Sequence, residues 1–381
     1  MCGLDGVGTR GQTAPMLEAE TVEAAPDAGV DPQAQPPHDE GRLPTPTHPV
    51  EPRCALFGRC GGCQLQHVPY DEQVAWKTAE VKRLLASALP DDTIDVAPCV
   101  GSPRAYGYRS KITPHFARPR NHQVPPIGFL QIGFKQRVID VETCALATDA
   151  INAALTEARA EVAAGAHVGR YRKGASLLLR DAASGVTTDF GATITESVGD
   201  LTLNFRAADF FQNNPFLLPR LAAHVAAEAR AGGARFLVDA YCGSGLLALT
   251  AAPGFERVVG VEVSPSSVKW ARENAATNAR ANCTFTASDA TRIFGDLPEG
   301  FRGADSAVIV DPPRKGCSPE FLEQLVAFAP RTIVYVSCNP ETQVRDLGVL
   351  RAAGWVVTKV QPFDMFPQTR HLECVATLAR S

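Results

Sequence analysis

One cysteine in this sequence stands where a nucleophile could work. The apolar, β-branched run of residues 332–336 is typical of a buried strand, and Cys338 follows it directly before Asn339 and Pro340. Because proline cannot continue the hydrogen-bond ladder, the thiol is expected in a turn at the carboxyl end of the strand. Open α/β sheets carry their reactive groups at that edge. Cys338 is therefore a candidate nucleophile if the chain also supplies a cofactor site and a base.

Three other cysteines stand close together near the start of the chain. Cys54, Cys60 and Cys63 have the spacing C-x5-C-x2-C, with glycines that let the backbone wrap closely around an ion or cluster. A closed site needs a fourth thiolate, and Cys144, at the end of a strand-like run, is the best candidate. Four thiolates suit either Zn²⁺ or an iron–sulfur cluster, and unpaired structural cysteines are the alternative.

A glycine-rich turn indicates a cofactor site. The strand-like residues 236–240 lead into a turn that contains Gly243 and Gly245, whose missing side chains let a ligand approach the backbone. Glu262 ends the next strand about twenty residues later, where a carboxylate can accept both hydroxyls of a ribose. The third glycine of a dinucleotide fingerprint is missing. The expected ligand is therefore S-adenosylmethionine.

Two more carboxylates follow predicted strands at the same edge. Asp289 comes after the third strand and is expected to meet the adenine, while Asp311 comes after the fourth and should face the methionine end or the target. Two prolines follow Asp311 and hold the loop rigidly, which suits the binding of a flat base.

The order of elements predicts an open α/β sheet. A helix is expected over residues 214–231, and strands separated by helical segments follow, except that no helix separates the last two. The expected strands are 236–240, 258–263, 284–287, 307–310, 332–336, 355–360 and 371–378. Alternation implies a parallel sheet with right-handed crossovers, and the final pair implies an antiparallel hairpin at one edge. This is the Rossmann-like, seven-stranded sheet of class I methyltransferases.

The chain divides into four predicted regions. Residues 1–50 are rich in proline, alanine and acids and are expected to be disordered. Residues 51–70 form the cysteine-cluster loop. An amphipathic helix over 70–89 opens a small β-rich central domain that extends over 71–205, with short alternating runs from 106 to 140 and from 176 to 205. Residues 206–381 form the catalytic domain.

Basic and aromatic side chains alternate in the β-rich domain. They are Arg104, Arg109, Lys111, Arg118, Arg120, Lys135 and Arg137, with Tyr106, Tyr108, Phe116, Phe129 and Phe134. Single-stranded RNA needs such a set, because cations bind phosphates and rings stack on bases. An ordinary solvated surface is the alternative.

The charge of the chain is uneven. Its formal charge is −4, but residues 1–50 hold eight acids and two arginines, so the remainder is about +2. That balance is compatible with an RNA partner. No run of residues has the length of a membrane span and the start lacks a secretory signal, so a cytoplasmic protein is expected. Nothing in the sequence indicates an obligate protein partner.

Several motifs together resemble those of the RNA uracil-C5 methyltransferase family. They are FFQNN at 210–214, DAYCGSG at 239–245, DPPRKG at 311–316, SCNP at 337–340 and RHLE at 370–373. Their order and spacing are similar across roughly residues 51–381. The resemblance implies an enzyme that makes 5-methyluridine with S-adenosylmethionine. It favours 23S-type ribosomal RNA as the substrate, with transfer RNA as the alternative.

The resemblance also assigns roles to residues. Cys338 takes the place of the nucleophile and Glu373 that of the base. The positions that contact the methyl donor are Gln212, Tyr241, Glu262 and Asp311. The cysteine quartet Cys54, Cys60, Cys63 and Cys144 looks like the family's [4Fe-4S] site.

Uracil chemistry explains why these groups are needed together. C5 of uracil is a poor nucleophile, so a thiolate adds first at C6 and makes C5 able to attack the methyl group. Glu373 would then remove the C5 proton, and Cys338 would leave. A thiol has an ordinary pKa of about 8.5. We therefore expect the site to lower the pKa of Cys338, with Arg314 or Arg370 as the cation.

Two other functions are compatible with parts of this pattern. An RNA cytosine-C5 methyltransferase uses the same thiol addition, but usually from a Pro-Cys pair, where this chain has Ser337-Cys338. A non-catalytic RNA-folding or iron-sensing protein could keep the fold and the cysteine cluster. Such a protein would need neither Cys338 nor Glu373.

Overall fold

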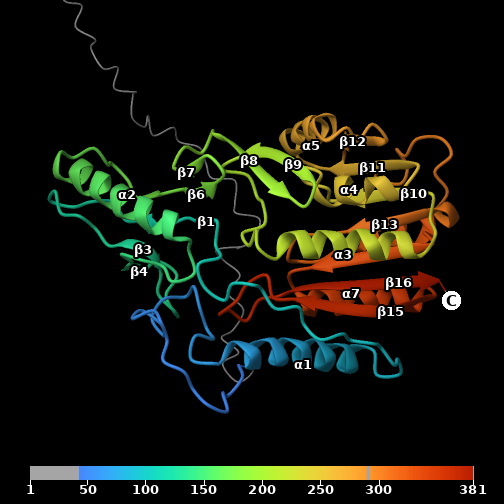
Figure 1. Ribbon diagram of the computed structural model, residues 1–381, viewed down its shortest axis with the longest axis horizontal. Coiled ribbons are helices and arrows are strands. Elements are labelled where there is room, and N and C mark those ends of the chain that lie inside the picture. The colour runs from blue at the N-terminus through green and yellow to red at the C-terminus, as the bar shows by residue number, and fades with distance from the viewer. Residues whose placement is uncertain (1–42, 290–291, 381) are drawn as a thin grey trace, which may run out of the picture.

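The computed structural model describes residues 43–289 and 292–380. Most of the predicted disordered tail, residues 1–50, therefore lies outside the described residues. Figure 1 shows an α/β sheet with its helices on one side of the picture and a smaller β-rich part on the other.

A seven-stranded sheet forms the larger part. Its strands are β10 (Phe236–Ala240), β11 (Arg257–Glu262), β12 (Cys283–Ala287), β13 (Ser306–Val310), β14 (Thr332–Ser337), β15 (Trp355–Phe363) and β16 (Glu373–Arg380). Their order is β12-β11-β10-β13-β14-β16-β15, with β16 antiparallel to both neighbours. The predicted class I methyltransferase sheet with an antiparallel edge hairpin is confirmed.

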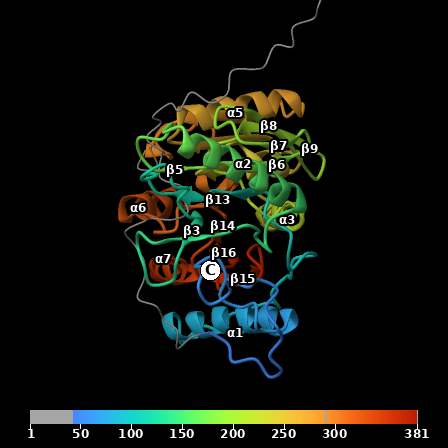
Figure 2. The same ribbon diagram turned by 90° about the vertical axis from the view of Figure 1, so that its left-hand side faces the viewer.

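Helices cover both faces of the sheet. They are α1 (Tyr70–Ala88), α3 (Leu218–Ala231), α4 (Leu246–Ala251), α5 (Pro265–Thr277), α6 (Pro319–Phe328) and α7 (Pro340–Ala352). Figure 2 shows α6 and α7 on one side and α3 on the other, with α1 near the β15 edge. Proline at the first position starts α5, α6 and α7, and a serine hydroxyl caps both α5 and α6.

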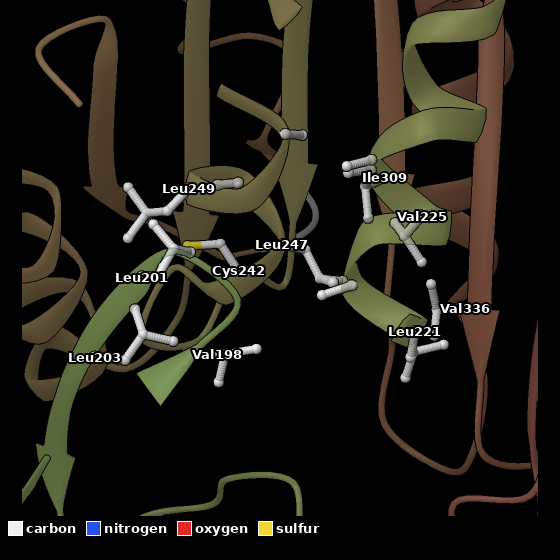
Figure 3. Packing of buried hydrophobic residues seen from close by; sticks show 14 of the residues in the cluster. Val198, Leu201, Leu203, Leu221, Val225, Cys242, Leu247, Leu249, Ile309 and Val336 are labelled. Atoms are coloured by element: carbon white, nitrogen blue, oxygen red, sulfur yellow. The ribbon is translucent and has the colours of Figure 1, made fainter. Parts of the chain in front are cut away.

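The sheet is apolar on both faces, as a doubly covered sheet must be. Alternate residues of one strand enter different cores, so that Ile333 faces α6 and α7 while Val334 and Val336 face α3. Figure 3 shows Leu221 and Val225 of α3 beside Ile309 and Val336 of the sheet.

The β-rich part contains two small sheets and one helix. One sheet has the order β1-β6-β7, and the other has the order β4-β3-β2-β5. The strands are β1 (Lys111–Ile112), β2 (His115–Phe116), β3 (Ile127–Leu130), β4 (Val138–Asp140), β5 (Ala175–Ser176), β6 (Leu179–Ala182) and β7 (Gly185–Thr187). Antiparallel pairing in this region agrees with the sequence prediction.

The helix α2 (Asp149–His167) was not predicted. Its signal was present, since Thr148 is an N-cap whose hydroxyl accepts from Ile151 N–H, and buried apolar residues recur at helical spacing. Ile151 and Leu155 pack with Ile112 and Leu179 and cover the β1-β6-β7 sheet.

The hairpin of β8 (Thr193–Val198) and β9 (Leu201–Arg206) was predicted with the β-rich domain, but it packs on the helices of the large sheet. Backbone N–H groups of Thr202 and Asn204 donate to the side-chain oxygens of Asn278 and Asn274, which stand at the end of α5. Leu203 enters the core on that face. Apolar alternation identified these strands correctly, but it carries no information about which body they cover.

Two further local predictions were inaccurate. The helix expected from residue 214 begins at Leu218, after a turn held by Asn214. Between β12 and β13 the described residues contain a 3₁₀ turn at Gly303–Asp305 but no α-helix. Among the described helices, none has the length and apolar character required to cross a membrane.

Candidate active site

Strand pairing brings Cys338 and Glu373 together. In the β14–β16 ladder Ser337 is paired with Cys374, so the next position along the same register sets Cys338 opposite Glu373. Glu373 is only 3% exposed, and Cys338 is half-buried. The two candidate chemical groups, 35 positions apart in the sequence, thus meet at the carboxyl end of β14.

Asp311 joins them at the same edge. It directly follows β13, whose last residue Val310 is paired with Tyr335 of β14. Burial raises the pKa of Asp311 to about 7. Burial, with the charge of Asp311, also raises the pKa of Glu373 well above its ordinary value.

The expectation of a lowered thiol pKa is wrong for the protein without ligands. Burial raises the pKa of Cys338 to about 12, and the charges of Glu373 and Asp311 act in the same direction. Of the two predicted cations, Arg314 and Arg370, Arg314 does lower the pKa of Cys338, but its effect is smaller than that of burial. The three acidic groups share a poorly hydrated space, so each ionisation opposes the others.

The glycine-rich turn lies beside Glu262, as predicted. Glu262 ends β11, and its carboxylate accepts the Gly243 N–H at 3.2 Å and the Ser264 N–H at 2.8 Å. Gly243 and Gly245 have positive φ angles of 52° and 94°, and Tyr241 has one of 67°. A positive φ at a tyrosine is an unfavourable conformation of the kind that concentrates at ligand-binding turns.

Asp239 belongs to this site but was not singled out from the sequence. It is fully buried at the end of β10, where one carboxylate oxygen accepts the Ala248 N–H at 2.9 Å. The other oxygen has no partner among the described residues. Burial, Asp311 and Glu262 together raise the pKa of Asp239 well above its ordinary value. The sequence did contain a signal for this residue, because Asp239 is an acid that stands between an apolar strand and the glycine-rich turn.

Two other residues predicted to contact the methyl donor are Asp289 and Gln212. Asp289 is exposed after β12. Burial raises the pKa of the Tyr241 phenol, and the nearby charge of Asp289 acts in the same direction. Gln212 is half-buried and lies in the chain between Phe211 and Asn214. The ring of Phe211 stacks on that of Phe205, with their centroids 4.2 Å apart. Asn214 donates to the carbonyl of Met365 at 3.2 Å and so ties this segment to the connection between β15 and β16.

Residues 364–372, here called the base loop, connect β15 to β16 and lead directly into Glu373. Buried side chains of α1 hold this loop. Gln73 exchanges two hydrogen bonds with Gln368, at 2.9 and 3.0 Å. Lys77 donates to the Asp364 carboxylate and to the carbonyls of Phe366 and His371. Their four-residue spacing on the apolar face of α1 was a signal that sequence reasoning overlooked.

The cysteine-cluster loop also contacts the base loop. Backbone N–H groups of Gln64 and Leu65 both donate to the Gln368 carbonyl at 3.0 Å, and the Gln64 side chain accepts the Arg370 N–H at 3.4 Å. Cys63, which directly precedes Gln64, therefore lies near the segment that carries the candidate base.

The four predicted metal ligands are near one another but do not form a metal site in this structure. The charges of Cys54 and Cys144 act on Cys60, and those of Cys144 and Cys60 act on Cys63. All four are half-buried, free thiols. Within the described ranges, however, no three Cys, His, Asp or Glu side chains are arranged to hold a metal ion.

The predicted RNA-binding set is divided by the structure. Tyr108 and Phe116 are buried, and half-buried Arg109 lies beside the thiols of Cys63 and Cys144. Exposed cations remain at Arg104, Arg118, Arg120, Lys135 and Arg137. Basic residues and rings that are close in sequence had suggested one surface, but alternate residues of a strand face opposite sides.

Known proteins are similar to this chain in sequence and in fold. An RNA methyltransferase of Oceanobacillus iheyensis is 31% identical, with 88% of this chain and 84% of that protein covered. A family model described as tRNA (Uracil-5-)-methyltransferase matches residues 195–381. This chain belongs to the RNA uracil-C5 methyltransferase family. The match includes the strands that carry Cys338 and Glu373.

Other members of the family are also similar. A tRNA (uracil(54)-C(5))-methyltransferase of Schizosaccharomyces pombe is 38% identical over 86% of this chain, which spans 65% of that protein, slightly under two thirds of its length. The crystal structure of the Pyrococcus abyssi tRNA (uracil-54, C5)-methyltransferase with S-adenosyl-L-homocysteine has the same fold, with a TM-score of 0.64. It is 24% identical and covers 84% of this chain and 86% of its own.

Proposed function

We propose that this chain transfers a methyl group from S-adenosylmethionine to C5 of a uridine in RNA. The observation that carries the proposal is the β14–β16 register, which sets Cys338 opposite Glu373 at the catalytic edge of a class I methyltransferase sheet. Family membership supports the same reaction.

The residues around the glycine-rich turn suit the methyl donor. Asp239 has a buried carboxylate oxygen without a partner among the described residues, and Glu262 stands at the end of the neighbouring strand. Gly243, Gly245 and Tyr241 supply a turn whose backbone a ligand can approach. The remaining residues that we propose for the donor are Gln212, Asp289 and Asp311.

The electrostatics also favour this ligand. When bound, S-adenosylmethionine supplies an electrophilic methyl group on a positively charged sulfur. Asp239, Asp311 and Glu373 have raised pKa values because burial and mutual repulsion oppose their ionisation. A nearby positive charge favours the ionised form of each group and of the Cys338 thiol. We infer that donor binding activates the nucleophile.

The chain's own groups can carry out the remaining steps. The Cys338 thiolate adds to C6 of the uracil, and the electron density moved to C5 forms the new bond to the methyl carbon. The bond from that carbon to the donor sulfur breaks in the same step, so that S-adenosylhomocysteine is the leaving group. The Glu373 carboxylate then takes the C5 proton, the double bond reforms, and the thiolate leaves. The uridine must be unstacked to reach a half-buried thiol, which is cheaper in an RNA loop than in a helix.

For the substrate we propose transfer RNA. The S. pombe relative is named for uracil 54 of tRNA, and we give this similarity more weight than the resemblance that favoured 23S-type ribosomal RNA. Incubation of the protein with labelled donor and with separate tRNA and 23S transcripts tests both the reaction and the choice. Label in 5-methyluridine of tRNA is expected, label only in 23S RNA would correct the substrate, and no label in either would refute the activity.

We further propose that Cys54, Cys60, Cys63 and Cys144 hold a [4Fe-4S] cluster. The support is the family resemblance, the mutual electrostatic influence of the thiols, and the guanidinium of Arg109 beside two of them, which would offset thiolate charge. The proposal requires the thiols to move closer together when the cluster binds. Zinc is the alternative metal, and no step of the reaction is assigned to the cluster.

A further inference from the structure

Two separate stretches of this chain are strongly basic. Residues 111–139 contain five Lys or Arg and no acid, and residues 168–180 contain four and no acid, although the whole chain has a formal charge of −4. Only the first stretch was recognised from the sequence.

The fold places the exposed ends of these stretches side by side. Strand β2 pairs with β5, with His115 opposite Ser176 and Phe116 opposite Ala175. Residues 117–123, which follow β2, therefore lie next to residues 168–174, which precede β5. The approach is close, because a Cβ added at Gly174 would be 2.5 Å from the Phe116 carbonyl oxygen.

The first of these segments is a tight turn. Arg120 and Gln123 form an antiparallel bridge, and the Gln123 N–H donates to the Arg120 carbonyl at 2.9 Å. Asn121 and His122 between them both have positive φ angles, of 50° and 59°, as a two-residue hairpin loop requires. A Cβ added at Gly169 would be 3.5 Å from the His122 ring, so the tip of the turn meets the second segment.

Five cations are exposed on this shared edge, which we call the β2–β5 basic edge. They are Arg118, Arg120, Arg170, Arg172 and Lys173. Within the described part of the chain, none of the five forms an ion pair. Some exposed arginines elsewhere are neutralised, as Arg235 is by Glu256 and Arg351 by Asp92.

The chemistry of the edge suits a phosphate backbone. Guanidinium groups bind phosphates through two parallel hydrogen bonds and keep their charge at all physiological pH values. The aromatic residues nearest in sequence, Phe116 and Tyr171, are buried or half-buried and stack edge to face on each other. These two rings are thus not offered for base stacking, and phosphate contacts position a nucleic acid without reading its sequence.

The position of the edge fits this role. In Figure 1 the β-rich part lies on the side of the large sheet toward which β14 runs, opposite the end marked C, where antiparallel β16 finishes. Contacts from Tyr108 to the Pro367 carbonyl and from α1 to the base loop connect this side to Glu373. RNA that inserts a uridine at Cys338 can therefore continue across the β-rich part.

We propose that the β2–β5 basic edge binds the phosphate backbone of the substrate RNA outside the loop that enters the active site. The inference rests on the proposed function for the identity of the RNA. The edge would supply affinity and orientation, while Cys338 and Glu373 act on the base.

The test compares two triple variants by RNA binding. Arg118→Gln/Arg120→Gln/Arg172→Gln removes three charges from the edge. Lys82→Gln/Arg230→Gln/Arg302→Gln removes three exposed charges elsewhere and is the matched control. The probe is a full-length tRNA transcript, and fluorescence anisotropy gives Kd over a range of salt concentrations. Binding of S-adenosylhomocysteine by calorimetry confirms that each variant is folded.

We expect the edge variant to bind the transcript at least about tenfold more weakly at moderate salt. Its plot of log Kd against log salt should lose about two units of slope, since each lost phosphate contact removes about 0.7–0.9. The control should match the wild type, and an Arg→Lys triple at the edge should recover much of the affinity because it keeps the charge. An unchanged Kd and slope, or equal losses in the control, would overturn the proposal.

A kinetic measurement separates this inference from the proposed function. The edge variant should have a raised KM for full-length tRNA with kcat retained, and unchanged methylation of a short oligonucleotide that contains only the target loop. If the wild type binds RNA through the edge but methylates no transcript, the proposed function fails and the binding surface stands. If methylation proceeds and the edge variant binds normally, only this inference fails.

Discussion

The ammonium of Lys77 lies 2.5 Å from the carboxylate of Asp364, and both side chains are fully buried. The pair joins α1 to the base loop nine residues before Glu373. Because Lys77 also binds two carbonyls of the loop, it acts as a positioning residue for the segment that carries the candidate base.

Replacement of Lys77 should therefore strongly lower the free energy of unfolding. Lys77→Met leaves the Asp364 carboxylate buried without its partner, and breaking such a pair costs about 3–5 kcal/mol of unfolding free energy. Urea unfolding measures the loss, with Lys82→Met on the exposed face of α1 as the control. The double variant Lys77→Met/Asp364→Leu should recover much of the stability. A loss below about 1 kcal/mol in the single variant would contradict a structural role for the pair.

Variants of the proposed nucleophile and of the proposed base should stop the reaction at different steps. Cys338→Ala is expected to abolish methyl transfer while RNA binding survives, because no adduct at C6 can form. Glu373→Gln should accumulate a covalent protein–RNA adduct, visible as a shifted band on a denaturing gel, because the C5 proton is not removed. Cys283→Ser, at another half-buried thiol outside the site, should retain activity. Full turnover by either site variant would exclude the proposed roles.

Thiol reactivity should report the electrostatics of the site. The pKa of Cys338 is raised to about 12, so alkylation by iodoacetamide near neutral pH should be slow and should accelerate about tenfold per pH unit below that pKa. Glu373→Gln removes a negative charge and should speed the reaction, whereas Arg314→Gln removes the cation and should slow it. Peptide mass spectrometry quantifies the modification of Cys338.

The same assay tests activation by the donor. An amine analogue of the donor carries its positive charge, whereas S-adenosylhomocysteine does not. Both ligands can shield the thiol sterically, so the two alkylation rates are compared with each other. The rate should be higher with the charged analogue. Equal rates with the two ligands would show that the sulfonium charge does not act on Cys338.

Ionisation of the Asp311 carboxyl should lower the free energy of unfolding, and the size of this effect should depend on pH. Its pKa is about 7 in the folded protein against 3.8 as the ordinary value, so the folded state holds the proton more tightly than the unfolded state. The destabilisation is absent at about pH 4 and below, grows as the pH rises toward 7, and is complete above it. Asp311→Asn should therefore stabilise the protein at pH 8 but not at pH 4, as measured by urea midpoints. An equal effect at both pH values would show that ionisation is not the cause.

The cysteine quartet should bind iron. Protein purified without air should be brown and contain iron and sulfide, and Cys60→Ser should reduce both. Cys283→Ser, outside the quartet, should leave the metal content unchanged. A colourless wild-type protein with one zinc would identify zinc as the metal, and a metal-free protein would leave the four thiols without that role.

The sequence by itself determined the type of sheet and the local chemistry at its edge. β-Branched runs, turn residues and glycine spacing are properties of contiguous residues, so they placed Cys338, Gly243 and Glu262 at the carboxyl ends of strands. The motifs also identified Glu373, but by resemblance alone. Nothing in the residues around position 373 shows that its side chain faces Cys338.

The tertiary structure decided what these groups meet. Cys338 and Glu373 are opposed because β16 pairs with β14 in one register, and a shift by one residue would turn Glu373 to the other face. The pKa of Cys338 depends on burial and on charges from β16 and from the loop after β13, which reversed the expected direction. The support from Lys77 and the β2–β5 basic edge likewise arise from pairings between distant segments. Local patterns therefore predict elements and candidate residues, whereas distances, fields and shared surfaces exist only after the chain has folded.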